Sequence, residues 1–174
     1  MLGNVPCVAR SSFLMKTIIV GLGNPILGDD GVGWKVAEEV QKQLSSPHWR
    51  GVRGEGNHVD VEFLSLGGLS LMEHLIGYER AILIDAMTSD QEPGCVISMR
   101  LSELPDHSAF HTTSTHDTSL QNALKLGKAM GADLPVQVDI VGLATDHVYE
   151  FGEELSLPIA QAVPKATQIV IDLL

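Results

Sequence analysis

The stretch that most constrains this chain runs from Gly21 to Gly33 and holds five glycines and two adjacent aspartates. It follows a short apolar run at 17–20, whose β-branched side chains favour a buried strand. It precedes residues 34–44, in which apolar positions 34, 36, 37, 40 and 44 recur with helical spacing. The stretch is therefore predicted to be a strand-to-helix loop, where ligands bind in an open α/β sheet.

Three interpretations compete for this loop. In the first, Asp29 or Asp30 caps the following helix and the glycines supply positive φ angles. In the second, the loop binds a dinucleotide phosphate, but Ile26 occupies the third glycine position of G-x-G-x-x-G and Pro25 removes an N–H donor. Two carboxylates would also repel a pyrophosphate, so this interpretation is rejected. The third is a metal-binding or catalytic carboxylate, which needs partners elsewhere in the chain.

Length and composition predict one globular domain. The chain has 174 residues, of which 44% are hydrophobic and 19% charged. We expect a single domain over 15–174, preceded by a disordered extension over 1–14. The formal net charge of -11 argues against a nucleic-acid partner and is compatible with a basic peptide.

The two cysteines, Cys7 and Cys95, make neither a disulfide framework nor a set of zinc ligands. This cysteine usage predicts a reduced, cytoplasmic compartment. No apolar run approaches the ~20 residues that span a bilayer, so no membrane association is expected. We expect a monomer.

Strand and helix patterns alternate along the chain in the order β-α-β-α-β-β-α-β-α. Strands are predicted over 17–20, 59–66, 80–86, 94–100 and 137–144, and helices over 34–44, 69–76, 118–130 and 157–174. The fourth strand follows a hairpin-like return and is expected to be antiparallel. The order predicts a three-layer α/β/α sandwich with a mostly parallel five-stranded sheet of the phosphorylase/hydrolase-like type.

Local signals also predict how two of the helices begin and how one continues. Asp117 or Thr118 is expected to cap the helix over 118–130, and Ser156 to cap the last helix. Pro164 lies inside the last helical pattern and is expected to kink it or split it in two.

Asp85 and a histidine-rich loop supply further candidate site residues. Asp85 ends a continuous apolar strand, where a carboxylate is costly unless it is paired or ligating; its alternative role is a cap for residues 87–89. The polar loop over 103–118 contains His107, His111 and His116. His116 lies just before a predicted helix, whose dipole favours the neutral, ligand-competent imidazole.

These residues are expected to converge because parallel strands bring their carboxyl ends to one edge of a sheet. Asp30, Asp85 and His116 would then share that edge. Two carboxylates and one imidazole suit a borderline divalent metal such as Ni²⁺, Zn²⁺ or Fe²⁺. His111 remains an alternative to His116, and a solvated loop remains an alternative for both histidines.

Several short motifs between Lys16 and Leu174 resemble those of the [NiFe]-hydrogenase maturation endopeptidases. They are Gly21-Leu22-Gly23-Asn24 with Asp29-Asp30-Gly31-x-Gly33, Ile84-Asp85-Ala86, Ser114-Thr115-His116 before a helix, Val141-Gly142-Leu143, and Leu155-Ser156-Leu157-Pro158. One segment departs from the family pattern: where the family has an Asp-Gly-Gly-Thr-type sequence, this chain has Leu66-Gly67-Gly68-Leu69. A role for that aspartate is therefore not carried over.

The resemblance implies a nickel-dependent, aspartic-type or metal-assisted endopeptidase. It would remove the C-terminal extension of a hydrogenase large-subunit precursor after nickel insertion. Nickel carried by that substrate would be the recognition motif, and a bound water would attack a nearby carbonyl. The family's nickel ligands and catalytic residues correspond to Asp30, where many members carry Glu, and to Asp85 and His116.

Two alternatives compete with this function. Peptidyl-tRNA hydrolases also open with the sequence found at Val20 to Pro25, but their downstream Thr-Arg-His-Asn segment is absent and the chain is acidic. A nickel-dependent maturation chaperone could use the same ligands without cleaving its partner.

Overall fold

The computed structural model describes residues 15–47, 49, 58–103, 119–146 and 151–174. Within them lie the strands β1 (Lys16–Leu22), β2 (His58–Leu64), β3 (Arg80–Met87), β4 (Val96–Arg100) and β5 (Gln137–Ala144). The helices are α1 (Val32–Leu44), α3 (Gly68–His74), α4 (Leu120–Ala129) and α5 (Leu157–Asp172), and two short 3-10 turns are η1 (Gly28–Gly31) and η2 (Leu101–Glu103). The predicted extension over 1–14 lies outside the described residues, so that prediction stays untested.

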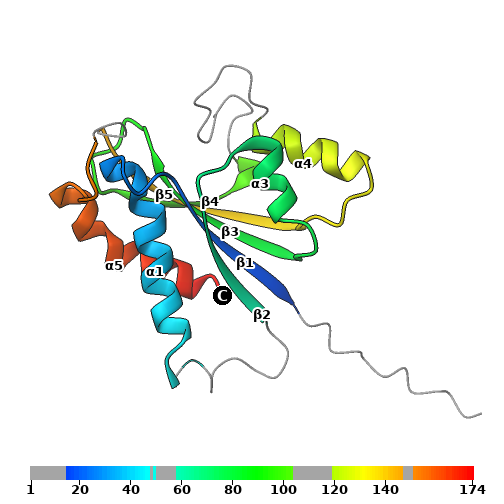
Figure 1. Cartoon of the computed structure of the whole chain (residues 1–174), viewed down its shortest axis with the longest axis horizontal. Helices are drawn as coiled ribbons and strands as arrows, with labels where there is room; N and C mark the ends of the chain where they lie inside the picture. Colours follow the sequence, from blue (N-terminus) through cyan, green and yellow to red (C-terminus); the bar gives the residue numbers. More distant parts are fainter. Residues whose placement is uncertain (1–14, 48, 50–57, 104–118, 147–150) are drawn as a thin grey trace, which may run out of the picture.

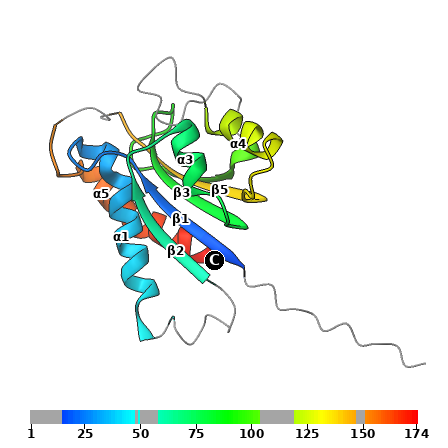
Figure 2. The ribbon, with the colours of Figure 1, turned by 45° about the vertical axis from the view of Figure 1, so that its right-hand side comes forward.

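The described strands form one sheet in the order β2-β1-β3-β5-β4. Every neighbouring pair is parallel except β4 and β5, which are antiparallel. Helices α1 and α5 cover one face, and α3 and α4 cover the other (Figures 1 and 2). The predicted three-layer α/β/α sandwich with a mostly parallel sheet is therefore confirmed, including the antiparallel fourth strand.

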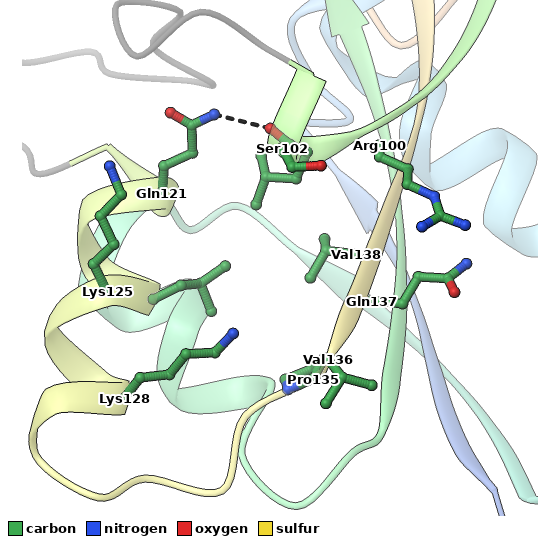
Figure 3. A pocket seen from close by; sticks show the side chains of 11 residues that line it. Arg100, Ser102, Gln121, Lys125, Lys128, Pro135, Val136, Gln137 and Val138 are labelled. Atoms are coloured by element: carbon green, nitrogen blue, oxygen red, sulfur yellow. Dashed lines mark hydrogen bonds between the residues drawn. The ribbon is translucent and has the colours of Figure 1, made fainter.

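The face covered by α3 and α4 is built from alternate residues of the central strands. Ala81 and Leu83 of β3 pack there with Leu71 of α3 and Leu124 of α4. Between α4 and the start of β5 a cavity of about 410 Å³ remains. Lys128 extends from α4 toward this cavity, whereas Arg100 and Gln137 point away from α4 (Figure 3).

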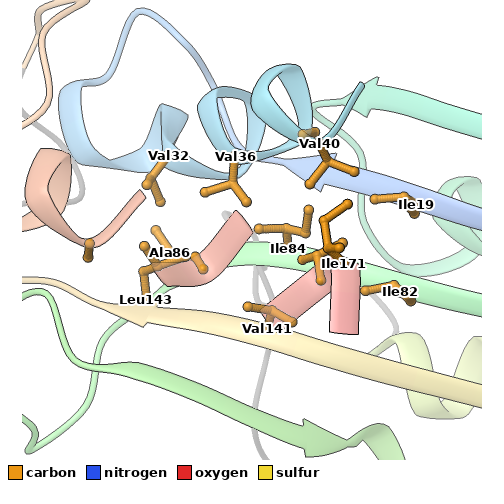
Figure 4. Close-up of a cluster of buried hydrophobic side chains, with 14 of the residues drawn as sticks. Ile19, Val32, Val36, Val40, Ile82, Ile84, Ala86, Val141, Leu143 and Ile171 are labelled. Atoms are coloured by element: carbon orange, nitrogen blue, oxygen red, sulfur yellow. The ribbon is translucent and has the colours of Figure 1, made fainter. Parts of the chain in front are cut away.

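The opposite face is built from the intervening residues. Ile82 and Ile84 of β3 are fully buried against Val36 of α1 and Val170 of α5 (the face is shown in Figure 4). Burying each such side chain contributes roughly 1.5–3 kcal/mol. Because β3 is apolar on both faces, it needs helices on both sides, which is why its sequence reads as one continuous hydrophobic run.

Two predictions about helix ends and continuity are corrected by the structure. Helix α4 begins after Ser119, whose hydroxyl accepts a hydrogen bond from the N–H of Asn122 at 3.4 Å; Asp117 and Thr118 do not occupy the cap position. Helix α5 does not split at Pro164 but continues to Asp172, and the alternative expectation, a kink at Pro164, stays a prediction. Its buried stripe on both sides of the proline packs against α1, and this packing offsets the loss of one backbone hydrogen bond. Ser156 does occupy the N-cap position of α5, as predicted.

None of the helices in the described part of the chain is both long and apolar enough to cross a membrane.

Candidate active site

The loop between β1 and α1 is held so close to the strand ends that only glycine fits at two positions. Gly23 has a φ of 114°, and a Cβ there would collide with the carbonyl oxygen of Asp30. Gly33, in the first turn of α1, contacts the carbonyl oxygens of Leu22 and Ile84 so closely that a Cβ has no space. The glycines therefore bring the start of α1 directly onto the carboxyl ends of β1 and β3.

Asp30 lies in η1 and is 5% exposed. Its Oδ2 atom accepts a hydrogen bond from the backbone N–H of Asn24 at 2.6 Å, which closes the loop on itself. Helix α1 has Gly31 at its N-cap position and no side-chain cap. The interpretation of Asp29 or Asp30 as a cap of α1 is therefore wrong.

Asp85 lies near the end of β3 and is fully buried. In register it pairs with Gly142 of β5, and Ile84 pairs with Gly21 of β1. Because side chains alternate along a strand, Asp85 points to the same face as Leu83, which α3 and α4 cover. The turn η1 contacts β3, so the structure places Asp30 and Asp85 at the same carboxyl edge of the sheet.

The third predicted ligand is a histidine of the loop over 103–118. His116, its alternative His111, and His107 all lie outside the described residues. In the described ranges, no group of three or more His, Cys, Asp or Glu side chains is arranged to hold a metal ion. The set of three ligands therefore stays a prediction. The structure describes two of its members, Asp30 and Asp85.

Asp29 binds groups that come from the other end of the chain. This carboxylate is 2% exposed and accepts hydrogen bonds from the hydroxyl of Thr145 at 2.9 Å, the N–H of Ser156 at 2.7 Å and the hydroxyl of Ser156 at 2.8 Å. It therefore lies at the N-terminus of α5, where the helix dipole favours a negative charge. Thr145 was not among the sequence-predicted residues, because its partner is 116 positions away.

Backbone hydrogen bonds join the same two segments. Gly152 accepts from the N–H of Gly28 at 2.7 Å and donates to the carbonyl of Ile26 at 3.0 Å, forming a parallel bridge beside Leu27. A cavity of about 380 Å³ lies here, lined in part by Asp29 and Phe151. The loop that carries Asp30 is thus supported by the segment between β5 and α5.

The cavity beside α4, by contrast, lies at the amino end of β5, away from Asp85.

Residues 55–173 match the model of a protein family described as HycI, hydrogenase maturation protease. The chain belongs to the hydrogenase maturation protease family.

Individual relatives agree with this family. The hydrogenase expression/formation protein HupD of Rhizobium leguminosarum bv. viciae is 23% identical over 159 residues, which cover 91% of this chain and 74% of HupD. Among solved structures, the hydrogenase maturating endopeptidase HybD from E. coli superimposes with a TM-score of 0.69 at 21% identity over 91% of each chain. The [NiFe] hydrogenase maturation protease HybD from Thermococcus kodakarensis gives a TM-score of 0.59 at 26% identity, covering 91% of this chain and 99% of that one.

Membership of the hydrogenase maturation protease family confirms the resemblance noted in the sequence motifs. It also confirms the predicted function, a peptidase for the C-terminal processing of a hydrogenase large subunit, over the peptidyl-tRNA hydrolase alternative.

Proposed function

We propose that this maturation protease cuts the precursor of a [NiFe]-hydrogenase large subunit only after nickel insertion, and that it recognises the nickel itself. The observation that carries the proposal is the shared position of two buried carboxylates. Asp30 and Asp85 come from different elements and lie at the same carboxyl edge of the sheet, which is where open α/β sheets bind ligands.

Asp30, Asp85 and His116 are the residues proposed to hold the precursor's nickel. Two carboxylate oxygens and one imidazole nitrogen suit Ni²⁺, and a chain of net charge -11 attracts cations. Nickel bound there would act as a Lewis acid on a carbonyl or a water molecule, so the peptidase would be metal-assisted, with aspartates as ligands. The nickel belongs to the substrate in this proposal.

Asp29 is not proposed as a catalytic base. Its carboxylate accepts three hydrogen bonds from Thr145 and Ser156. A carboxylate with these contacts is held in place and orients the turn that carries Asp30.

The test compares purified large-subunit precursor with and without nickel, incubated with the wild-type protein. Mass spectrometry should show a shortened large subunit only for the nickel-loaded precursor. Asp85→Asn and His116→Ala should lower the cleavage rate by ~100-fold or more, since losing a group at the reacting centre typically has an effect of that order. Circular dichroism and the melting temperature check that both variants fold.

Matched variants away from the site serve as controls. Asp133→Asn removes an exposed carboxylate, and His58→Ala removes an exposed imidazole that pairs with Asp60 at the surface. Both should process the precursor at the wild-type rate. Wild-type rates for Asp85→Asn and His116→Ala would overturn the ligand assignment, and equal cleavage of nickel-free precursor would overturn nickel recognition. A stable, uncut complex with the wild-type protein would identify the chaperone alternative.

A further inference from the structure

Large apolar side chains stand exposed beside the candidate active site. Ile26 is 51% exposed, Phe151 88% and Leu157 71%. Gly152, which follows Phe151, donates a hydrogen bond to the carbonyl of Ile26. Ile26 therefore lies beside the segment that carries Phe151. Leu157 follows Ser156, which binds Asp29. All three residues therefore belong to the two segments, 26–29 and 151–157, whose hydrogen bonds support the loop that carries Asp30.

Acidic side chains border this apolar group. Glu153 and Glu154 are exposed in the same short segment, and residues 151–157 contain no lysine or arginine. Glu154 and Phe151 also line the cavity of about 380 Å³ next to Asp29. We define the docking patch as Ile26, Phe151, Leu157, Glu153 and Glu154.

Exposed apolar area of this kind is unfavourable in water, and burying a side chain such as Phe151 in an interface removes that area from water. In the described part of the chain nothing covers Phe151, which keeps 88% of its surface exposed. A partner that buries it would therefore gain affinity from one side chain, as interface hot spots do.

We infer that the docking patch binds the hydrogenase precursor beside the bond to be cut, through a segment with an apolar side chain flanked by lysine or arginine. The inference rests on the proposed function and names what the precursor must present. Two observations select this occupant. The patch is continuous with the loop of Asp30, and its carboxylates complement basic side chains.

A second copy of this chain fits the patch less well. Two copies would bring the carboxylates of Glu153 and Glu154 together between molecules that each carry a net charge of -11. Like charges at an interface are strongly unfavourable. A copy seated beside Asp29 would also obstruct the edge where Asp30 and Asp85 lie.

The first experiment measures kcat and KM for nickel-loaded precursor with Phe151→Ala and Leu157→Ser. Both variants should raise KM about 10-fold with little change in kcat, because they remove binding that is equal in the ground and transition states. The matched controls are Val136→Ala and Met130→Ser, whose side chains are 88% and 78% exposed on the far side of the molecule from the patch. The controls should keep the wild-type KM.

The second experiment reverses the charge of the patch. Glu153→Lys combined with Glu154→Lys should raise KM and weaken its dependence on salt, since the attraction to basic side chains is lost. Glu73→Lys combined with Asp133→Lys makes the same change in net charge at exposed positions elsewhere and should have a smaller effect.

The outcomes separate this inference from the proposed function. If the wild-type protein does not cut nickel-loaded precursor, the proposed function fails. If it does, and the patch variants keep KM within twofold of the controls, the docking patch is wrong while the function stands. A concentration-dependent dimer that Phe151→Ala abolishes in gel filtration would assign the patch to self-association instead and overturn the inference.

Discussion

Asp29, Asp30 and Asp85 lie at the same edge of the sheet, and the structure gives each a different environment. Asp29 binds the start of α5, Asp30 binds its own loop through Asn24, and Asp85 is buried in β3. The sequence could single out Asp30 and Asp85, because adjacent carboxylates in a glycine-rich loop and a carboxylate at the end of an apolar strand are unusual. It could not assign Asp29, since the hydrogen-bond donors for that carboxylate lie 116 and 127 residues away.

Replacing Asp29 tests whether its hydrogen bonds stabilise the folded protein. Asp29→Ala should lower the free energy of unfolding by about 2–4 kcal/mol, because it removes three charge-assisted hydrogen bonds and leaves buried donors without acceptors. Urea unfolding of the wild-type and variant proteins measures this difference. The control is Asp146→Ala, because Asp146 is exposed and lies just after the end of β5, next to Thr145. This variant should change the free energy of unfolding by less than about 0.5 kcal/mol. If Asp29→Ala also lowered the free energy of unfolding by less than about 0.5 kcal/mol, the contacts of Asp29 would not stabilise the fold.

Helix α1 shows what the hydrophobic pattern predicts and what it misses. Apolar spacing correctly identified a helix over 34–44, yet the helix begins two residues earlier, at Val32. Its second residue is Gly33, which has no side chain to contribute to the pattern. The reason for that glycine is tertiary, since Gly33 lies against the carbonyl oxygens of Leu22 and Ile84.

Gly33 offers a test in which helix propensity and packing make opposite predictions. Alanine in a helix interior is normally favoured over glycine by about 1 kcal/mol. Gly33→Ala should instead destabilise the protein by ~2 kcal/mol or more, because the added methyl group collides with two backbone carbonyls. Thermal and urea unfolding measure the change. Gly152→Ala is the control, because a Cβ there meets no atom within 4 Å. A Gly33→Ala protein as stable as the wild type would contradict the close approach of α1 to the strands.

At the scale of the whole molecule, the order of elements along the chain was predictable and the order of strands in the sheet was not. The pattern over 137–144 coincides with β5, and the continuous apolar run ending at Asp85 identified a central strand. Neighbours in the sheet depend on long-range pairing, which a one-dimensional pattern does not record. The shared edge of Asp30 and Asp85 was nevertheless predictable, because βαβ connections bring parallel strand ends together.

The backbone amides of the sheet should be protected from hydrogen exchange to different degrees. β1, β3 and β5 are paired on both sides and almost wholly buried, whereas β2 and β4 form the two edges and are partly exposed. Amide hydrogen exchange followed by mass spectrometry should therefore be slowest in the three central strands and faster in β2 and β4, by 10-fold or more. Equal protection in β4 and β3 would contradict the strand order.

The contacts of Asp29 have a consequence for how the protein is made. A ribosome synthesises the loop of Asp30 early, but Thr145 and Ser156 emerge only after more than a hundred further residues. The loop of Asp30 in the nascent chain therefore lacks this support until Ser156 has been synthesised. If Asp30 acts on the precursor as proposed, a nascent chain that has not yet reached Ser156 should not cut it, because the turn that carries Asp30 still lacks these hydrogen bonds.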